Sequence, residues 1–391
     1  MIFFKYFLFY ITTNNWLRCV ISQKINDVKN NNDISNSSDT RIKRKIRGDT
    51  PNKWSLLISY YVDENVDPNL IRESLNQLQL ETCLRFRELK RMIPNVSGIR
   101  YIYGNGCFSR VGKADGVQWQ RISIGDNCDN IGRVQHETFH ALGIDHEHNR
   151  IDRNHYLYIL EKNINDICKR NFFIVSPLNG NTLNIPYDYG SIMHYDIRAF
   201  GKNKEITMLP KDELYKKTIG HINDLSFNDI KTLNLYYCTK RCSKRIKCYN
   251  RGYQNPNMCN TCKCVEGFTG KNCKLLSISP PSCGKTFFYA EKFTQQIKAE
   301  GKNYCIYHIK AKNRRKIGIK IDFVDMRPHT RRICRFKNSL EIKYWDDKTV
   351  TGARFCGLIS KTIFLSKSDY VIIYYRSTIR KNKFQLKFKK M

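Results

Sequence analysis

The sequence lacks any apolar run long enough to cross a membrane as a helix, since a span needs roughly 20 such residues. It also lacks an internal repeat, which argues against a solenoid or propeller. Acidic residues are scarce, with 35 Asp and Glu against 68 Lys and Arg, so the formal net charge is +33. The hydrophobic share of 41% is too high for a disordered chain, and 391 residues allow two or three folded domains.

Cysteine, in contrast, is abundant, with 16 residues. Such a density indicates an oxidising compartment. The chain begins with one early lysine beside an apolar run, residues 1–12, of about the length of a signal-peptide core. We therefore expect residues 1–22 to be a signal peptide and the protein to be secreted into the extracellular space. A buried N-terminal strand is the alternative for this run.

Polar residues dominate the next stretch, 24–40, which shows no apolar periodicity. The stretch ends in the basic run 41–44, and such a run is usually a solvated charge cluster. Between a signal peptide and a folded domain, however, it is typical of a processing site. We interpret 23–44 as a pro-segment that is removed by cleavage after Arg44.

A large α/β-type pattern follows in segment 45–238. β-rich stretches predict strands at 54–62, 99–103 and 117–124. Asp67 offers a helix N-cap and Pro68 suits the first helical position. Apolar residues at helical spacing predict one helix over about 68–90, whose core face holds Ile71, Leu75, Leu78 and Leu89.

Six cysteines fall within the next segment, 239–278, namely Cys242, Cys248, Cys259, Cys262, Cys264 and Cys273. So little chain cannot build a core without crosslinks. The spacing Cys-x-Cys, followed by Gly267-Phe-Thr-Gly270 and Cys273, resembles an EGF-like module. Zinc held by two close cysteine pairs is the alternative, which an exported chain makes less favourable.

The last segment, 283–391, contains alternating stretches such as 317–323 and 370–375 that predict a β-sandwich. The order Cys283-Gly, Cys305, Cys334 and Phe-Cys356-Gly resembles a CUB domain. That resemblance implies the disulfides Cys283–Cys305 and Cys334–Cys356. Calcium-binding CUB domains carry an Asp shortly after the third cysteine, where this chain has Arg-Phe-Lys-Asn at 335–338, so we do not expect calcium.

The central motif is His136-Glu-Thr-Phe-His140-Ala-Leu-Gly143-Ile-Asp-His146. Residues four apart share one face of a helix, so His136 and His140 can bind the same ion. Gly143 permits the positive φ at which the chain leaves the helix and brings His146 back as a third ligand. Three histidines leave one position open, as in catalytic zinc sites, and Glu137 is placed to act as general base toward a metal-activated water. We expect one Zn²⁺ per subunit.

Taken singly, each histidine is more often a satisfied core or surface residue than a ligand. Together, they lie in a sequence that resembles the metzincins and, within them, the astacin family, whose motif continues with Glu147, Arg150, Asp152 and Arg153. The stretch Ser191-Ile-Met-His-Tyr195 resembles the Met-turn of that family, although it also fits a core strand. The resemblance implies that Met193 lies beneath the zinc imidazoles. It also implies that Tyr195 is an extra zinc ligand that moves away to stabilise the transition state.

The likeness covers nearly all of 45–238 and implies two disulfides in this domain, Cys83–Cys238 and Cys107–Cys128. The EGF-like and CUB-like segments account for five further pairs. Of the two remaining cysteines, Cys19 would leave with the signal peptide. Cys168 would then have no partner, so we expect it to be a free or intermolecular thiol.

The astacin resemblance also places the mature N-terminus at Lys45, directly after Arg44. In the family this N-terminus is buried near the Glu that follows the third His, here Glu147; a plain solvated charge is the alternative. The pro-segment departs from the family pattern, because Gly48-Asp49 falls inside the mature chain and lacks the usual Phe. The sequence therefore identifies no residue that blocks the zinc before activation.

The positive charge is concentrated in 283–391, where 27 Lys and Arg against 8 Asp and Glu leave a net charge of +19. A basic exported domain favours acidic glycans, matrix or anionic cell surfaces as partners. General solubility is the alternative, and the disulfide pattern argues against nucleic acid. Asn95-Val-Ser is a glycosylation sequon in an exported chain.

These features predict an α+β metzincin-type catalytic domain at 45–238, with an N-terminal twisted sheet, an active-site helix and a C-terminal subdomain with few regular elements. An EGF-like module at 239–278 and a β-sandwich CUB-like domain at 283–391 would follow. The predicted function is a secreted zinc-dependent endopeptidase of extracellular or host-tissue proteins. The alternatives are a non-catalytic adhesion or binding protein on the same scaffold and a narrow-specificity processing protease.

Overall fold

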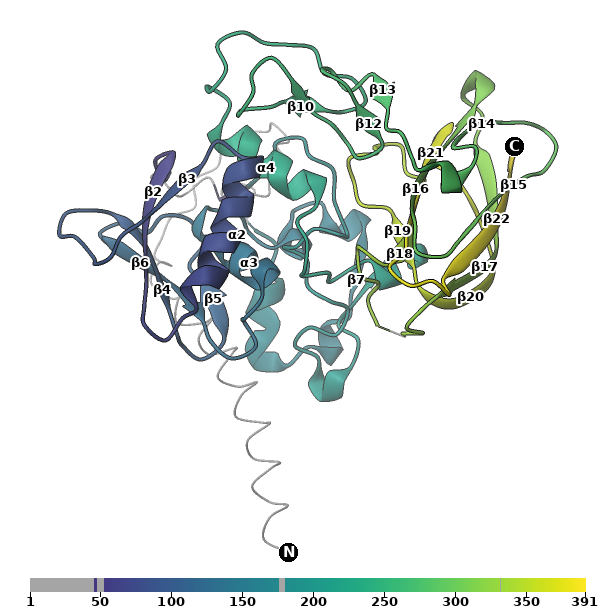
Figure 1. Ribbon diagram of the computed structural model, residues 1–391. Coiled ribbons are helices and arrows are strands. Elements are labelled where there is room, and N and C mark those ends of the chain that lie inside the picture. Colours follow the sequence, from purple (N-terminus) through teal and green to yellow (C-terminus); the bar gives the residue numbers. More distant parts are fainter. Residues whose placement is uncertain (1–45, 48–52, 176–179, 331) are drawn as a thin grey trace, which may run out of the picture. The chain divides into compact units, whose positions relative to one another are not determined.

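The computed structural model describes residues 46–47, 53–175, 180–330 and 332–391 (Figure 1). The expected signal peptide, pro-segment and cleavage site, together with Cys19 and Lys45, lie outside these residues. The chain divides into two compact units. The first holds the described residues up to Ile185 with Tyr195–Lys211 and Leu235–Tyr237, and the second holds Pro186–His194, Asp212–Asn234 and Cys238–Met391.

A five-stranded sheet in the order β3-β2-β4-β6-β5 forms the N-terminal part of the first unit. Its strands are β2 (Leu57–Val62), β3 (Arg85–Glu88), β4 (Gly98–Ile102), β5 (Cys107–Ser109) and β6 (Trp119–Ile124). The pairs β2–β3, β2–β4 and β4–β6 are parallel, and β5 pairs antiparallel with β6. The buried side chains of Ile58, Ile99 and Ile122 form its core. The three strands predicted from the sequence are confirmed, although the first begins at Leu57.

The helix predicted over 68–90 is wrong in its C-terminal part. Helix α2 (Pro68–Glu81) begins at the expected cap, Asp67. It ends because Thr82 takes an extended backbone and its hydroxyl donates to the Leu78 carbonyl at 2.7 Å. The chain then enters β3, whose pairing with β2 satisfies backbone groups that a longer helix would otherwise use. Leu89, expected on the core face, therefore lies beyond the helix.

Helix α3 (Ile131–Ala141) packs beside α2 and contacts β5 and β6 (Figure 1). Two hydrogen bonds anchor this helix to the N-terminal part of the unit. The Trp54 indole donates to the Ala141 carbonyl at 2.9 Å, and the Tyr101 hydroxyl lies 3.0 Å from Thr138 Oγ1. Because both ends of these contacts are buried, the orientation of the helix is fixed relative to the sheet.

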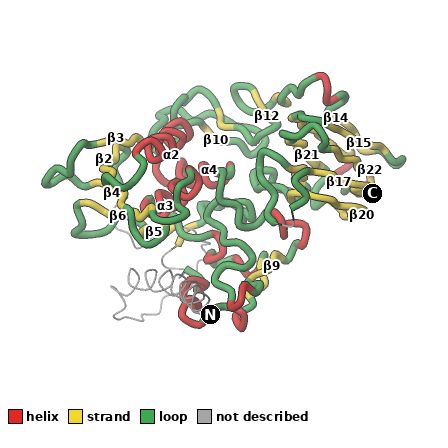
Figure 2. The backbone as a smooth tube through the Cα atoms, turned by 60° about the horizontal axis from the view of Figure 1, so that its bottom comes forward, coloured by secondary structure: helices red, strands yellow, loops and turns green. Residues whose placement is uncertain are grey.

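The described residues between α3 and α4 (Phe227–Tyr237) form short elements joined by loops (Figure 2). Within this stretch β7 (Leu157–Ile159) pairs antiparallel with β9 (Met208–Pro210), and β8 (Gly180–Asn181) pairs antiparallel with β1 (Ile46–Arg47), which lies near the start of the described chain. The 3-10 helices are η1 (Glu147–Asn149), η2 (Arg153–His155), η3 (Glu161–Asn163), η4 (Asp166–Phe172), η5 (Lys202–Lys204) and η6 (Glu213–Lys217). The prediction of a C-terminal subdomain with few regular elements is confirmed.

Residues 239–278 form a small crosslinked module. Its two antiparallel pairs are β10 (Tyr253–Gln254) with β11 (Cys262–Lys263) and β12 (Phe268–Thr269) with β13 (Leu275–Leu276). The disulfides are Cys242–Cys259, Cys248–Cys262 and Cys264–Cys273. The first cysteine thus joins the third, the second the fourth and the fifth the sixth. Because all six sulfurs are in disulfides, the zinc alternative for this segment is wrong.

The C-terminal domain is a sandwich of two sheets, with strand orders β14-β16-β21-β18-β19 and β15-β22-β17-β20. Its strands are β14 (Phe287–Ala290), β15 (Gln295–Glu300), β16 (Tyr304–Ala311), β17 (Ile317–Met326), β18 (Ser339–Lys343), β19 (Ala353–Phe355), β20 (Gly357–Leu365), β21 (Tyr370–Arg376) and β22 (Lys383–Lys390), with 3-10 helices η7 (Pro281–Cys283) and η8 (Lys312–Arg314). The Phe384 ring of one sheet packs on Tyr307 and Tyr375 of the other, at centroid distances of 6.3 and 5.2 Å. The predicted β-sandwich is confirmed, as are its disulfides Cys283–Cys305 and Cys334–Cys356.

The cysteines of the first 238 residues fit the expectation only in part. Cys107–Cys128 is a disulfide, as predicted. Cys83 and Cys238 are each disulfide-bonded, and their mutual pairing stays a prediction. The expectation of a free or intermolecular thiol at Cys168 is wrong, because Cys168 is buried and disulfide-bonded. Counting cysteines along the sequence misassigned it, because pairing depends on distance in the folded chain.

Within the described ranges, no helix has the length and apolar character needed to cross a membrane.

Candidate metal centre

Helix α3 carries the first two histidines of the predicted zinc motif. The Asn130 side chain caps the helix by accepting a hydrogen bond from the Arg133 amide at 3.0 Å. From this start, His136 and His140 fall one turn apart on the same face. Their ring centroids lie 4.7 Å apart, with the ring planes at 90°.

A glycine turn brings in the third histidine. Gly143 has φ +95°, and its amide donates to the His140 carbonyl at 2.8 Å. A Cβ at this glycine would have space, with its nearest neighbour 3.7 Å away, so it is the backbone angle that requires glycine. After this turn, the ring of His146 lies 4.4 Å from the His140 ring and 5.3 Å from the His136 ring.

The three histidines fit one zinc ion. One ring nitrogen of each lies within 4.8 Å of the others. The Nε2 atoms of His140 and His146 are 3.1 Å apart, close to the ~3.3 Å expected for two ligands at about 2.0–2.1 Å from a tetrahedral ion. His140 Nδ1 lies 2.8 Å from the Ile144 carbonyl oxygen. Since a carbonyl only accepts hydrogen bonds, Nδ1 carries the proton and Nε2 offers its lone pair to the metal.

Glu137 lies next to the first ligand and is almost fully buried, with 6% of its surface exposed. Its Oε2 atom has no hydrogen-bond partner. Burial raises the pKa of this carboxyl to about 8, partly opposed by the positive charge of Arg133. A buried, unsatisfied carboxyl is costly in a purely structural role, so its presence beside the histidines favours a chemical role.

Tyr195 lies against the third histidine. The ring centroids of Tyr195 and His146 are 4.3 Å apart, and burial raises the pKa of the phenol far above its usual value. The ring of His148 stacks on Tyr195 at 4.0 Å and also lies 5.3 Å from the His146 ring, so the three rings form one cluster. The Nε2 atom of His148 is 3.1 Å from the Asn171 carbonyl oxygen. The sequence analysis did not single out His148, since its spacing from the motif carries no separate signal.

Met193 belongs to the second unit and is fully buried. The turn around it is held by Asp229 of α4, which accepts hydrogen bonds from Ser191 Oγ at 2.6 Å and from the Ile192 amide at 2.9 Å. Ser191 Oγ in turn accepts from the Met193 amide at 3.1 Å. The stretch 191–195 is therefore a hydrogen-bonded turn, and the alternative of a core strand is wrong.

Glu147 is fully buried and pairs with an equally buried arginine. Arg150 Nη1 donates to Glu147 Oε1 at 3.1 Å, while Nε and Nη2 donate to Asp152 at 2.9 and 2.8 Å. Arg150 Nη2 also donates to the Ile185 carbonyl at 3.1 Å. The alternative of a solvated charge at Glu147 is therefore wrong, although its expected partner, Lys45, lies outside the described residues.

Asn95, the expected glycosylation site, lies in an exposed turn with φ 61°. Its Oδ1 accepts a weak hydrogen bond from Gln118 Nε2 at 3.3 Å. Solvent can reach the side chain, which is the condition that a glycan would need.

A mostly parallel sheet backed by a helix that carries two histidines, followed by a glycine turn and a third histidine, defines a metzincin-type zinc domain. The comparisons with known families make this assignment specific. The astacin peptidase family matches residues 47–238, and the CUB domain matches residues 285–388. The chain therefore belongs to the astacin family, with a CUB domain after its catalytic domain.

Nematode proteins are among the relatives of this chain. Zinc metalloproteinase nas-34 of Caenorhabditis elegans is 36% identical over 86% of this chain and 55% of its own length. Zinc metalloproteinase nas-36 of Haemonchus contortus is 31% identical over 91% of this chain and 60% of its own length. The chain thus spans little more than half the length of these relatives. Among solved structures, the medaka hatching enzyme HCE-1, a zinc-protease, is 30% identical over 48% of this chain and 92% of its own, with a TM-score of 0.42.

Proposed function

We propose that this protein is a zinc-dependent endopeptidase that hydrolyses peptide bonds in extracellular or host-tissue proteins. The observation that carries the proposal is Glu137, a buried and unsatisfied carboxyl beside three convergent histidines. The zinc metalloproteinase names of the relatives agree with it. A non-catalytic adhesion protein would have no use for an intact set of ligands and a buried general base. A narrow-specificity processing protease would differ in substrate alone.

The residues of the site divide the work of the reaction. Zinc, when held by His136, His140 and His146, supplies Lewis-acid catalysis that polarises a carbonyl group and makes water more acidic. The positive charge of zinc bound beside Glu137 would lower the pKa of this carboxyl, so that as a carboxylate it would accept the proton of the attacking water and pass it to the leaving amine. The Tyr195 phenol donates a hydrogen bond to the carbonyl oxygen as that oxygen becomes negative.

The test is a substitution that removes the proposed general base, Glu137, and leaves the three histidine ligands unchanged. We expect Glu137→Ala to retain its zinc, measured by metal analysis, and to lose about 10²–10⁴-fold in kcat, because general-base catalysis contributes that much. Glu161→Ala, at an exposed glutamate of η3, is the matched control and should keep full activity. A zinc-loaded Glu137→Ala protein with unchanged kcat would remove the basis of the proposal.

Activation by cleavage after Arg44 is part of the same proposal. Support comes from Ile46–Arg47, which pairs with Gly180–Asn181 and so ties the chain just after the cleavage point to the domain. The buried carboxylate of Glu147 is the proposed partner of the new N-terminus at Lys45. N-terminal sequencing of the active form tests this step, since an active chain that starts elsewhere contradicts it.

The parts around the catalytic domain suit a secreted enzyme. Sixteen cysteines favour an oxidising compartment, and the disulfide pattern of 239–278 supports an EGF-like module. By family likeness Met193 is the base of the zinc site and Cys83–Cys238 a disulfide of the catalytic domain. The exposed Asn95 is the proposed site of glycosylation. Intact mass of the secreted chain, before and after glycosidase treatment, tests the last of these.

Acidic glycans or matrix are the proposed partners of the basic C-terminal domain. The turn between β16 and β17 supports this, because four of its residues are exposed and basic, Lys312, Arg314, Arg315 and Lys316, and the exposed Lys310 precedes them near the end of β16. Retention of the full chain on heparin should fall when the four turn residues are replaced by serine. Equal retention of both proteins would rule out this turn as the glycan site.

A further inference from the structure

The five-stranded sheet of the CUB domain is buried on both faces. Along β21, Val371, Ile373 and Tyr375 alternate with Ile372 and Tyr374, and all five side chains are buried. Tyr375 packs on Phe384 of the second sheet, so it faces the inside of the sandwich. Because successive residues of a strand point to opposite faces, Ile372 and Tyr374 lie on the outside, where an isolated sandwich would be exposed to water.

The small module covers one part of this outer face. Val265, Phe268 and Cys273 of the module form a single hydrophobic cluster with Ile306, Ile372 and Tyr374. The Tyr374 hydroxyl donates to the Glu266 carbonyl at 2.8 Å, and the Glu266 carboxylate pairs with Arg376. The module and the CUB domain therefore share one hydrophobic cluster and pack against each other as a single body.

Segments of the catalytic domain contact β19 and the loop that precedes it. Trp345 of the CUB domain packs on Tyr215 and Tyr189, with ring centroids 5.1 and 5.7 Å away. Its indole nitrogen donates to Asp212 Oδ2 at 2.9 Å. Thr218 Oγ1 accepts from the Arg354 amide at 2.8 Å. These contacts belong to the second unit, in which catalytic-domain residues and CUB residues pack together.

A tight contact is made just before the turn that contains Met193. Asp188 Oδ1 accepts hydrogen bonds from the Gly190 amide and from the Thr351 amide, both at 3.0 Å. An added Cβ on Gly190 would lie 2.4 Å from Thr351 Oγ1 and 2.5 Å from its Cβ. The position of this turn is therefore set by a CUB-domain loop. Tyr195 follows His194 directly along the chain, one residue beyond the supported segment.

From these contacts we propose that the CUB domain is a structural support of the segment 186–194, with Trp345 and Thr351 as positioning residues for that segment and, through the covalent link from His194, for Tyr195. The inference rests on the proposed function, because its main readout is catalysis. It differs from the usual expectation of a tethered binding domain, which would leave the turn unaffected by changes in the CUB domain.

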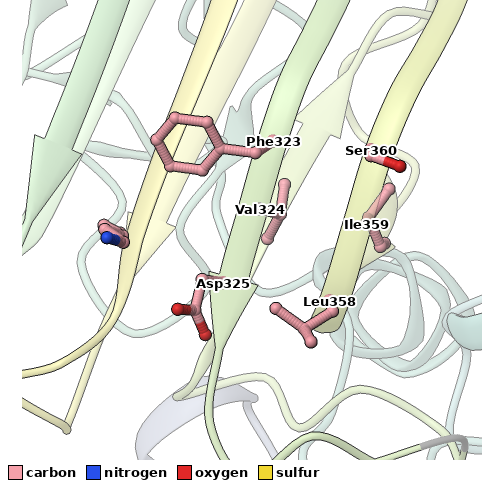
Figure 3. Close-up of a pocket in the computed structure, with 7 residues that line it drawn as sticks. Phe323, Val324, Asp325, Leu358, Ile359 and Ser360 are labelled. Atoms are coloured by element: carbon pink, nitrogen blue, oxygen red, sulfur yellow. The ribbon is translucent and has the colours of Figure 1, made fainter.

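The first experiment changes Trp345 in the full, zinc-loaded, activated chain. Trp345→Ala should lower kcat at least about tenfold with little change in KM or zinc content, because small misplacements of reacting groups are costly. Trp345→Phe, which keeps an aromatic ring in place of the indole but loses the hydrogen bond to Asp212, should recover most of the loss. The matched control is Phe323→Ala, an aromatic ring on the outward face of the other sheet. That ring lines a hollow of about 380 Å³ with Leu358 and Lys383 (Figure 3).

The second experiment tests the contact from both sides. Gly190→Ala should lower kcat because its new methyl group meets Thr351, and Thr351→Gly in the same chain should restore it by removing the obstructing atoms. Rescue shows that the effect of Gly190→Ala arises from the contact with Thr351. A thermal midpoint close to that of the wild type in Gly190→Ala separates loss of positioning from loss of folding. A double variant as slow as Gly190→Ala alone would overturn the proposal.

Hydrogen–deuterium exchange measures how well the CUB domain orders segment 186–194, and it does not require an active enzyme. Trp345→Ala should increase deuterium uptake in peptides that cover 186–195, whereas Phe323→Ala should not. Unchanged uptake in Trp345→Ala overturns the inference even if the enzyme proves active. The wild-type chain could also cleave no peptide while Trp345→Ala shows increased uptake. That result would support the structural role of the CUB domain and contradict the proposed function.

Discussion

The imidazole of His148 stacks on the phenol ring of Tyr195, with ring centroids 4.0 Å apart and ring planes at 29°. Tyr195 also touches the ring of His146, a proposed zinc ligand, at 4.3 Å. The rings of Tyr195, His146 and His148 therefore form one mutual cluster, since the two histidine rings are themselves 5.3 Å apart. The Tyr195 hydroxyl is protonated at neutral pH, and burial raises its pKa further. A neutral phenol is a hydrogen-bond donor, which is what a developing oxyanion requires.

Tyr195→Phe should therefore lower kcat by about 10²–10³-fold, the usual cost of losing one oxyanion donor. KM and zinc content should change little, because phenylalanine keeps the ring that packs on His146 and His148. Steady-state kinetics on a fluorogenic peptide measure the effect. Tyr158→Phe, at a tyrosine that is 57% exposed, is the control. An unchanged kcat in Tyr195→Phe would exclude the phenol from the reaction.

The local part of the site could be predicted from the sequence because it depends on short-range geometry. The spacing of His136 and His140 on one helix face and the glycine angle at Gly143 need no tertiary information. The stacking of His148 on Tyr195 joins residues far apart in the chain, and no pattern marks it. The core of the catalytic fold could be predicted equally well, from apolar strands and a capped helix.

Other features could not be predicted correctly from the sequence, because they depend on contacts between residues far apart in the chain. Leu89 continued the helical period, yet Thr82 ends the helix because β3 pairs with β2 instead. Assigning the other cysteines to pairs from the sequence left Cys168 without a predicted partner, yet Cys168 is disulfide-bonded in the folded chain. The alternation of Ile372 and Tyr374 with the inward residues of β21 predicted a strand, but it could not show that a second surface covers the outer face.

Removal of one histidine should abolish tight zinc binding. His146→Ala leaves two ligands, and the loss in zinc affinity should exceed the about 10–100-fold that loss of a mere supporting group costs. Competition with a chromophoric chelator measures the affinity, and peptidase activity should fall in parallel. His155→Ala, at an exposed histidine, serves as control. A His146→Ala protein that holds zinc as tightly as the wild type would exclude this histidine as a ligand.

Arg150 should be essential for stability. Its side chain is 1% exposed and neutralises the buried carboxylates of Glu147 and Asp152. Arg150→Met removes the partner of two buried charges, which costs about 3–5 kcal/mol, so the thermal midpoint should fall by about 10 °C. Arg72→Met breaks an exposed pair with Glu88, which solvent screens, so the thermal midpoint should change little. Equal midpoints for the two variants in a thermal scan would contradict a structural role for the buried pair.

The stability of the second unit should depend on the protonation of His308, a buried residue of β16 that is 1% exposed. Burial lowers the pKa of His308 from 6.5 to about 4. Between about pH 4 and 6.5 the imidazole of His308 is protonated in the unfolded chain but neutral in the folded chain. Stability is therefore fully present above about pH 6.5 and falls as the pH drops toward 4, by at most about 3 kcal/mol from this group.

His308→Gln, which cannot titrate, should remove that part of the acid sensitivity. The ring nitrogen Nδ1 of His308 lies 2.7 Å from the Tyr370 hydroxyl, a contact that an amide side chain can partly replace. Thermal midpoints of the two proteins, measured from pH 4 to 8, should therefore converge toward the acid end of the range. The exposed His155→Gln should follow the wild-type curve throughout. Parallel curves for His308→Gln and the wild type would show that this histidine is not what makes the domain sensitive to acid.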